Sequence, residues 1–153
     1  YGATKFLMEK LFNQFEEINP KVKYRVVRLG NIIYSVDSVL CKWKKLIEDC
    51  KEVIVTDKRA TRFFMTSEES IDSILNCLEN AKDSKPYFEP MKSTSIGNLL
   101  QAMINKYLPK GCDLPIKTIG LQPSENLHEK ITEDGVFTNE IEQYTVEELE
   151  EMV

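Results

Sequence analysis

Amphipathic helices alternate with short β-branched segments along this chain of 153 residues. The first helix is expected over residues 3–17, ended by Asn19 and Pro20, and the first strand over 23–28, with two valines at its centre. A helix followed by a strand is half of a βαβ unit, whose strands pair in parallel. The sequence therefore predicts an α/β fold built on a parallel sheet.

The alternation continues beyond residue 38. Further helices are expected at 38–50, from 66 onward, at 95–108 and near the acidic segment 144–151, with strands at 52–56, 87–90 and 116–119. Trp43 is expected to pack in the core rather than to stack on a ligand. The helix faces that we expect to be buried include Phe6, Leu7, Leu11 and Phe15 in the first helix, and Ile71, Ile74, Leu75 and Leu78 in the helix that starts at 66.

Composition excludes several classes of function. The formal net charge is −5, and the 20 basic residues are scattered, which argues against a nucleic-acid partner. No apolar run approaches the roughly 18–20 residues of a membrane helix, and no signal peptide is visible. The cysteines at 41, 50, 77 and 112 have no metal-binding spacing, so we expect free thiols in a reducing, cytoplasmic setting and no metal site.

The first five residues carry a chemically useful pair. Tyr1 and Lys5 are four positions apart, so on a helix they lie on one side. The ammonium favours the phenolate and lowers the pKa of the tyrosine, which suits proton exchange with an alcohol. Such a pair also arises by chance, and alone it indicates little.

Three further segments accompany this pair. They are Val26-Val27-Arg28-Leu29-Gly30-Asn31, the run Thr-Asp-x-x-x-Thr-Arg-Phe-Phe-x-Thr at 56–66, and Gly-Leu-Gln-Pro-Ser-Glu-Asn-Leu-His-Glu at 120–129. Together with Tyr-Gly-Ala-Thr-Lys at 1–5, they resemble extended short-chain dehydrogenases/reductases. More narrowly, they resemble the CapD-like polysaccharide biosynthesis family, the UDP-N-acetylglucosamine 4,6-dehydratases.

The resemblance covers the C-terminal half of such an enzyme. No G-x-x-G-x-x-G turn is present, so the cofactor's pyrophosphate site is expected upstream of residue 1. The implied fold is the C-terminal part of a Rossmann-type NAD(P)-binding domain, over residues 1–55. A small mixed α/β substrate-binding lobe with a tail is expected over 56–153.

The implied function is conversion of a UDP-N-acetylglucosamine-type substrate to a 4-keto-6-deoxy sugar by internal hydride transfer through NADP or NAD. Some members also epimerise the sugar at C5. The full-length form is expected to be a homo-oligomer, and an isolated half to be inactive. Two alternatives remain open: a related nucleotide-sugar epimerase or reductase, and a truncated, inactive relative that serves as a binding or assembly subunit.

The resemblance also implies site residues. Tyr1 and Lys5 would be catalytic and contact the cofactor, and the substrate would be bound by Asn31, Ser38, Arg62, Gln122 and Glu125. Each has an ordinary alternative: Asn31 could only shape a turn, and Arg62 could be a surface residue beside buried phenylalanines.

The chain departs from the family pattern at several positions. Gln122, Ser124 and Asn126 replace Arg, Gly and Lys, which removes two cations and predicts weaker UDP binding. Asp37 replaces a glycine and would either repel a diphosphate or cap the next helix. The single histidine, His128, is expected to be structural.

Overall fold

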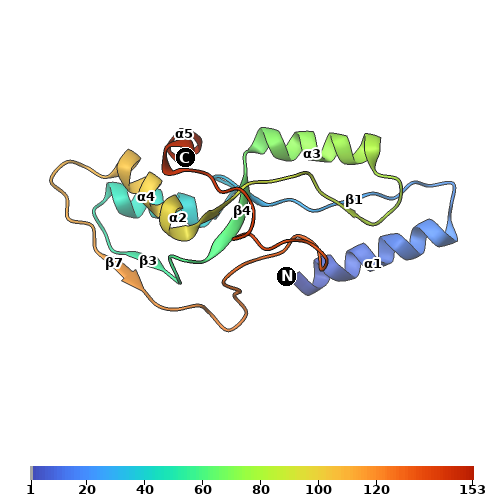
Figure 1. Cartoon of the computed structure of the whole chain (residues 1–153), viewed down its shortest axis with the longest axis horizontal. Helices are drawn as coiled ribbons and strands as arrows, with labels where there is room; N and C mark the ends of the chain where they lie inside the picture. The colour runs from blue at the N-terminus through green and yellow to red at the C-terminus, as the bar shows by residue number, and fades with distance from the viewer. Residues whose placement is uncertain (1) are drawn as a thin grey trace. The chain divides into compact units, whose positions relative to one another are not determined.

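The computed structural model describes residues 2–153, so Tyr1 lies outside the described residues. The chain forms two compact units, each made of two separate stretches (Figure 1). The first unit comprises residues 1–29 and 67–90, and the second comprises 30–66 and 91–153. The expected division at residue 55, between a cofactor-binding part and a substrate-binding lobe, stays a prediction.

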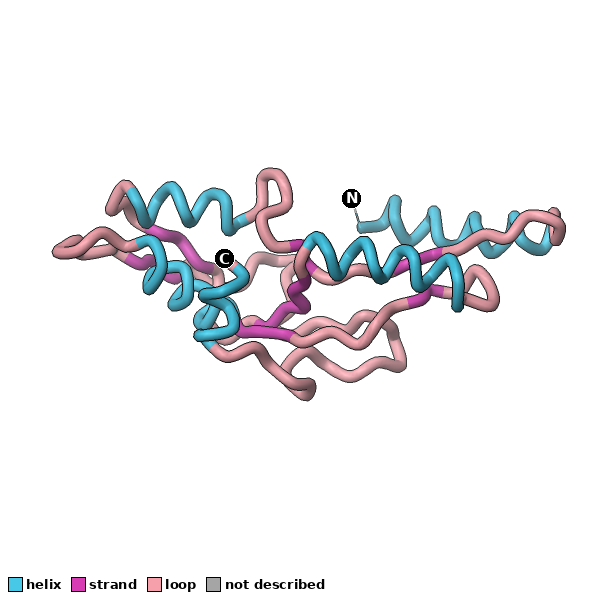
Figure 2. The backbone as a smooth tube through the Cα atoms, turned by 90° about the horizontal axis from the view of Figure 1, so that it is seen from above, coloured by secondary structure: helices cyan, strands magenta, loops and turns pink. Residues whose placement is uncertain are grey.

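The first unit holds two helices and one parallel pair of strands. Its elements are α1 (Gly2–Ile18), β1 (Val26–Val27), α3 (Ser67–Asn80) and β5 (Pro86–Tyr87), with β1 parallel to β5. The expected first helix and strand are therefore confirmed, although the strand is shorter than predicted. Strands this short leave most of the chain between helices as loop (Figure 2).

The expected burial of the first unit's apolar helix faces is wrong. Among the described residues of α1, none is buried; Leu7 is 60% exposed, and Leu78 of α3 is 63% exposed. Among the described residues, the elements of this unit are two helices and two strands of two residues each, and these do not cover the apolar helix faces. Instead α3 buries its small side chains, among them Ser73 and Cys77, and the Cys77 sulfur lies 3.7 Å from the Val26 carbonyl oxygen of β1.

Polar contacts attach α1 to the rest of the first unit. Arg28 holds Glu9 through two hydrogen bonds, with nitrogen–oxygen distances of 3.0 and 2.7 Å. Glu16 pairs with Arg25 at 3.2 Å and accepts the Ser84 backbone N–H at 2.8 Å. A bidentate arginine–carboxylate pair fixes orientation as well as distance, so these contacts define how the helix lies.

The second unit holds the remaining elements and the main core. They are β2 (Asn31–Ile32), α2 (Val39–Glu48), β3 (Val53–Val55), β4 (Thr61–Met65), β6 (Ser93–Ser95), α4 (Ile96–Tyr107), β7 (Ile116–Thr118) and α5 (Val146–Met152). Strand β4 pairs in parallel with β2 and antiparallel with β6, and β3 pairs in parallel with β7. The α/β class with parallel strands is thus observed, with its strands in small separate sheets.

Helix signals in the sequence account for the ends of these helices. Ser95 caps α4 by accepting the Asn98 N–H at 3.0 Å. Thr145 and Glu148 form a reciprocal capping box at the start of α5. Helix α2 ends with Cys50 in the left-handed conformation at φ 55°, where the Cys50 and Lys51 amides satisfy the carbonyls of Ile47 and Leu46.

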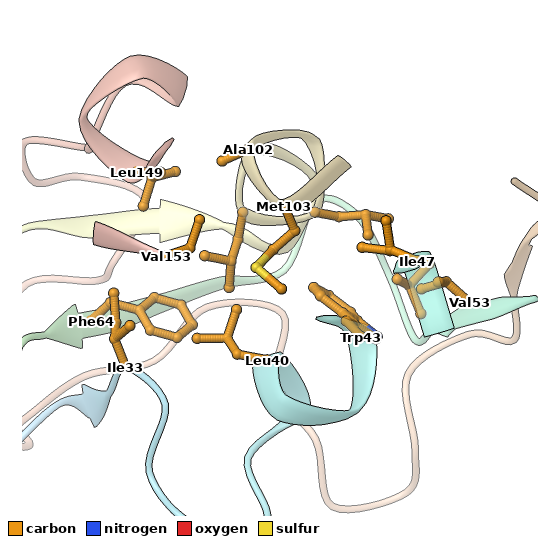
Figure 3. Packing of buried hydrophobic residues seen from close by; sticks show 13 residues of the cluster. Ile33, Leu40, Trp43, Ile47, Val53, Phe64, Ala102, Met103, Leu149 and Val153 are labelled. Carbon is orange, nitrogen blue, oxygen red and sulfur yellow. The ribbon is translucent and has the colours of Figure 1, made fainter. Parts of the chain in front are cut away.

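The core of the second unit lies between helices α2, α4 and α5 and the strands. Trp43 is 3% exposed and Met103 is fully buried, and Figure 3 shows both side chains in the layer between α2 and α4. The packing role expected for Trp43 is confirmed. The buried members of this core are Ile33, Leu40, Trp43, Ile47, Val53, Val55, Phe64, Leu99, Leu100, Ala102, Met103, Leu149 and Val153.

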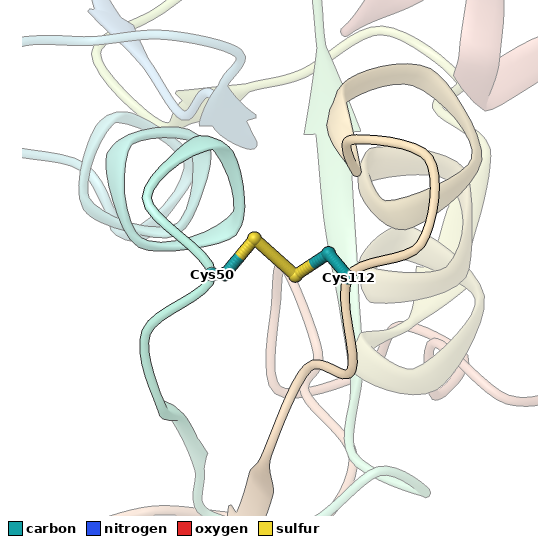
Figure 4. The surroundings of a disulfide bond; sticks show 2 residues. All are labelled: Cys50 and Cys112. Atoms are coloured by element: carbon teal, nitrogen blue, oxygen red, sulfur yellow. A yellow bond between two sulfur atoms is a disulfide. The ribbon is translucent and has the colours of Figure 1, made fainter.

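A disulfide joins Cys50, after α2, to Cys112, after α4 (Figure 4). Their Cα atoms are 6.1 Å apart, within the usual range for a disulfide. The expectation of free thiols is therefore wrong for these two cysteines and confirmed for Cys41 and Cys77. Sequence spacing gave no sign of the bond because two turns, after α2 and after α4, bring the cysteines together. Cys50 and Cys112 therefore give no support to the inference of a reducing compartment.

Candidate functional site

A cavity of about 430 Å³ opens in the second unit, within the range of small-molecule sites. It lies where β2 and β3 end and where helices α2 and α4 begin, the usual place for a ligand in a parallel α/β fold. It is lined by Asn31, Ile32, Ser35, Ser38, Val39, Leu40, Trp43, Ile54, Val55, Thr56, Arg62, Phe64, Ile96 and Glu125.

Four of the five residues expected to bind substrate line this cavity: Asn31, Ser38, Arg62 and Glu125. Gln122 does not line it, although its backbone N–H donates to Glu125 Oε2 at 3.3 Å. Of the two residues expected to be catalytic, Lys5 lies in the first turns of α1, in the first unit, and Tyr1 lies outside the described residues. The structure thus assembles the expected substrate residues, and their roles stay predictions.

Arg62 is a buried strand residue rather than a surface one. It belongs to β4, and its side chain is only 10% exposed. Its Nη1 donates to the carbonyl oxygens of Thr61 and Leu127 at 2.8 and 3.2 Å. Its remaining contacts are ion pairs at 3.0 Å, from Nη2 to Glu125 and from Nε to Glu129. The positive charge of this buried guanidinium is therefore compensated by two carboxylates and two carbonyl oxygens.

The two carboxylates beside Arg62 differ in their surroundings. Glu125 lines the cavity and also accepts the Thr56 hydroxyl at 2.9 Å. Glu129 is not among the lining residues, and burial raises the pKa of its carboxyl above the usual range. Arg62 opposes this shift, and the charge of Glu125 adds to it. Glu129 thus pairs with Arg62 outside the cavity lining, while Glu125 is the carboxylate partner that a ligand in the cavity would meet.

Asn31 and Ser38 provide neutral polar groups at the cavity wall. The Asn31 Nδ2 donates to the Phe63 carbonyl at 3.0 Å, which fixes the amide beside β4. Ser38 is the N-cap residue of α2, but its hydroxyl makes no capping hydrogen bond. Asp37 does not cap this helix, as one alternative proposed; it has φ 61°, a conformation that explains the family's glycine at this position.

Sequence reasoning missed a buried hydroxyl network behind Arg62. The Thr61 Oγ1 lies 2.8 Å from His128 Nδ1 and 2.6 Å from Thr138 Oγ1. Thr138 is fully buried and accepts the Glu129 N–H at 3.0 Å. The network ties the segment that carries Glu125 and Glu129 to β4, and it gives His128 the structural role expected for it. Thr138 stands in no recognisable motif, so no sequence signal marked it.

Two glycines next to the cavity lining, Gly30 and Gly97, are closed to a phosphate group. A phosphate cradle needs glycines whose missing Cβ leaves room for a ligand. At Gly30 that room is filled by Phe63 and the Met91 sulfur, and at Gly97 by Lys58. Among residues 2–153, no helix is long and apolar enough to cross a bilayer, and no group of three metal-binding side chains occurs.

Known structures share this fold. The chain superposes on Pen from Bacillus thuringiensis with a TM-score of 0.85 and 22% identity, over 99% of this chain and 56% of that one. It superposes on the UDP-N-acetylglucosamine 4-epimerase of Methanobrevibacter ruminantium M1, in complex with UDP-N-acetylmuramic acid, with a TM-score of 0.70 and 18% identity, over 99% and 51% of the two chains. At these identities the likeness shows the fold alone.

Sequence relatives are more specific. The chain is 34% identical over 149 residues to the inverting UDP-N-acetylglucosamine 4,6-dehydratase of Campylobacter jejuni subsp. jejuni serotype O:23/36 (strain 81-176), and it covers 42% of that protein. It is 32% identical over 131 residues to the capsular polysaccharide biosynthesis protein CapD of Staphylococcus aureus, covering 22% of it. The chain therefore spans less than half of either relative. The model of the family described as "Polysaccharide biosynthesis protein" matches residues 1–149, and the chain belongs to this family.

Proposed function

We propose that this chain supplies the sugar-nucleotide binding part of a nucleotide-sugar 4,6-dehydratase. The observation that carries the proposal is the convergence of Asn31, Ser38, Arg62 and Glu125 on one cavity of about 430 Å³. Identity of 34% to a UDP-N-acetylglucosamine 4,6-dehydratase supports this substrate class. The product would be a 4-keto-6-deoxy sugar.

Each cavity group has a role that suits its chemistry. Arg62 would hold a diphosphate oxygen by charge-assisted hydrogen bonding, and Asn31 and Ser38 would bind sugar or phosphate oxygens. The apolar wall formed by Leu40, Trp43 and Ile54 would exclude water from the bound ligand. Tyr1 would exchange a proton with the substrate hydroxyl, and Lys5 would favour the phenolate.

Calorimetric titration of UDP-N-acetylglucosamine into the purified 153-residue chain tests the proposal. Arg62→Gln should weaken binding by roughly 10–150-fold, because a hydrogen bond to a charged group contributes about 1.5–3 kcal/mol. Arg59→Gln is a matched control, since Arg59 is 78% exposed and pairs with Asp57 away from the cavity lining. Circular dichroism would confirm that both variants fold.

Absence of binding to the wild-type chain would overturn the proposal, and so would equal losses in the two arginine variants. A second function, that of a catalytically inactive binding subunit, is favoured by one observation. The charged side chains of the cavity lining are Arg62 and Glu125, which neutralise one another. Binding of UDP-N-acetylglucosamine by a form that includes the upstream half, without turnover in the presence of NADP or NAD, would support this second function.

A further inference from the structure

Three donors converge on the carboxylate of Glu125. The Thr56 hydroxyl and Arg62 Nη2 both reach Oε1, at 2.9 and 3.0 Å, and the Gln122 backbone N–H reaches Oε2 at 3.3 Å. Two of these donors belong to cavity-lining residues. A hydroxyl, a guanidinium and a backbone amide are the groups that proteins use to bind phosphate oxygens.

Arg62 can meet a ligand in the cavity through Nη2, the nitrogen that donates to Glu125. Its Nη1 is engaged by two backbone carbonyls, and its Nε by Glu129. Only Nη2 is directed toward the residue that lines the cavity. An anion that used Nη2 and the Thr56 hydroxyl together would compete with the Glu125 carboxylate, which accepts from both.

We propose that Glu125 occupies the anion subsite of the cavity and that a diphosphate-type ligand binds by displacing it. The inference rests on the proposed function, because it assigns a binding position to the diphosphate of the proposed ligand. Glu125 lies on the loop between β7 and α5, outside any helix or strand, and its side chain is 25% exposed. After displacement Arg62 would still have Glu129 as a counter-ion, since that pair uses Nε.

Glu125 is thus a specificity-determining residue that lowers affinity for simple anions. Only a ligand with enough other contacts in the cavity, such as a nucleoside diphosphate with its sugar, would displace it at low concentration. Small phosphates, which lack those contacts, would be excluded. This discrimination makes a direct prediction: removing the carboxylate should let small anions bind.

Inorganic pyrophosphate is the probe, titrated at low ionic strength into the full chain by calorimetry. Glu125→Ala should bind it at least tenfold more tightly than the wild type, and Glu125→Gln by a smaller factor, since its amide oxygen still accepts from the same donors. The gain should disappear when Glu125→Ala is combined with Arg62→Gln. Glu151→Gln, an exposed change on α5, controls for the lost charge.

Unchanged or weaker pyrophosphate binding in a folded Glu125 variant would overturn the inference. Far-ultraviolet circular dichroism identifies folded variants, and Glu125→Gln decides the outcome if Glu125→Ala does not fold. The two proposals can fail separately. Tighter pyrophosphate binding in the Glu125 variants, without any UDP-sugar binding, would support the displacement of Glu125 and refute the proposed substrate class. Arg62-dependent UDP-sugar binding, without tighter pyrophosphate binding in the Glu125 variants, would support the proposed substrate class and refute the displacement of Glu125.

Discussion

Removing the Cys50–Cys112 disulfide should lower the free energy of unfolding of the second unit by about 4 kcal/mol. The bond joins residues 62 positions apart, and closing a loop of that length restricts the unfolded chain by about this amount. Domains of this size are stable by only about 5–15 kcal/mol. For a unit of this size, the loss corresponds to a fall in melting temperature of roughly 16–32 °C.

Trp43 provides the assay, because it is the only tryptophan and is 3% exposed in the core of the second unit. Its fluorescence would be followed in urea for the wild type, for Cys112→Ser and for the wild type with a reductant. Cys112→Ser is preferred to a change at Cys50, whose left-handed backbone at φ 55° adds a separate effect. Cys41→Ser, at an exposed free thiol, is the control.

Two results would refute this reasoning. A loss below about 1 kcal/mol in Cys112→Ser would show that the cross-link does not restrict the unfolded chain as the loop model requires. Labelling of all four cysteines in the unfolded, unreduced chain would show that the bond does not form. Reductant should leave the stability of Cys112→Ser unchanged, since that variant has no bond to lose.

Three smaller predictions test local features by urea unfolding. Asp37→Val should cost about 1–2 kcal/mol, because φ 61° disfavours a β-branched residue, whereas Asp37→Gly should change stability by less than about 0.5 kcal/mol. Thr145→Ala removes the cap of α5 and should lower the free energy of unfolding by about 1 kcal/mol. An unchanged urea midpoint in this variant would contradict the stabilising role of the capping box. Hydrogen bonds from Arg59 lower the pKa of Asp57 to about 2 from 3.8, so its contribution is present above pH 3.8 and lost as the pH falls toward 2. Asp57→Asn should flatten the pH dependence of the midpoint over that range, and an unchanged slope would refute the assignment.

Sequence periodicity predicted most of the elements but not what covers them. The alternation of helix and strand signals located the helices from α1 to α5, because each carries an apolar stripe and a recognisable end. The stripe does not reveal whether a partner layer exists. On α3, Ser70, Ser73 and Cys77 are buried while Ile71 and Leu78 are exposed. Strand β6, Ser-Thr-Ser, was missed because these residues carry no strand propensity pattern.

The candidate site was predictable as a set of residues but not as a network. Motif positions pointed to Arg62 and Glu125, and the structure places them in contact across 63 positions of sequence. Spacing cannot show that Arg62 is held by carboxylates, since Glu129 reaches it only after the chain folds back over β4. The same holds for Thr138, whose role depends on a contact with Thr61 that no local pattern encodes.

The interleaving of the two units has a consequence for folding during synthesis. The first unit begins before the second and is completed by residues 67–90, after the chain has already entered and left the second unit. The core of the second unit then waits for Leu149 and Val153, both buried against α4 and its neighbours. At about 5–20 residues per second, the ribosome delivers residue 153 several seconds after residue 90. Throughout that interval Leu40, which is already synthesised, lacks its final packing partners, so this is when we expect the chain to be most exposed to aggregation.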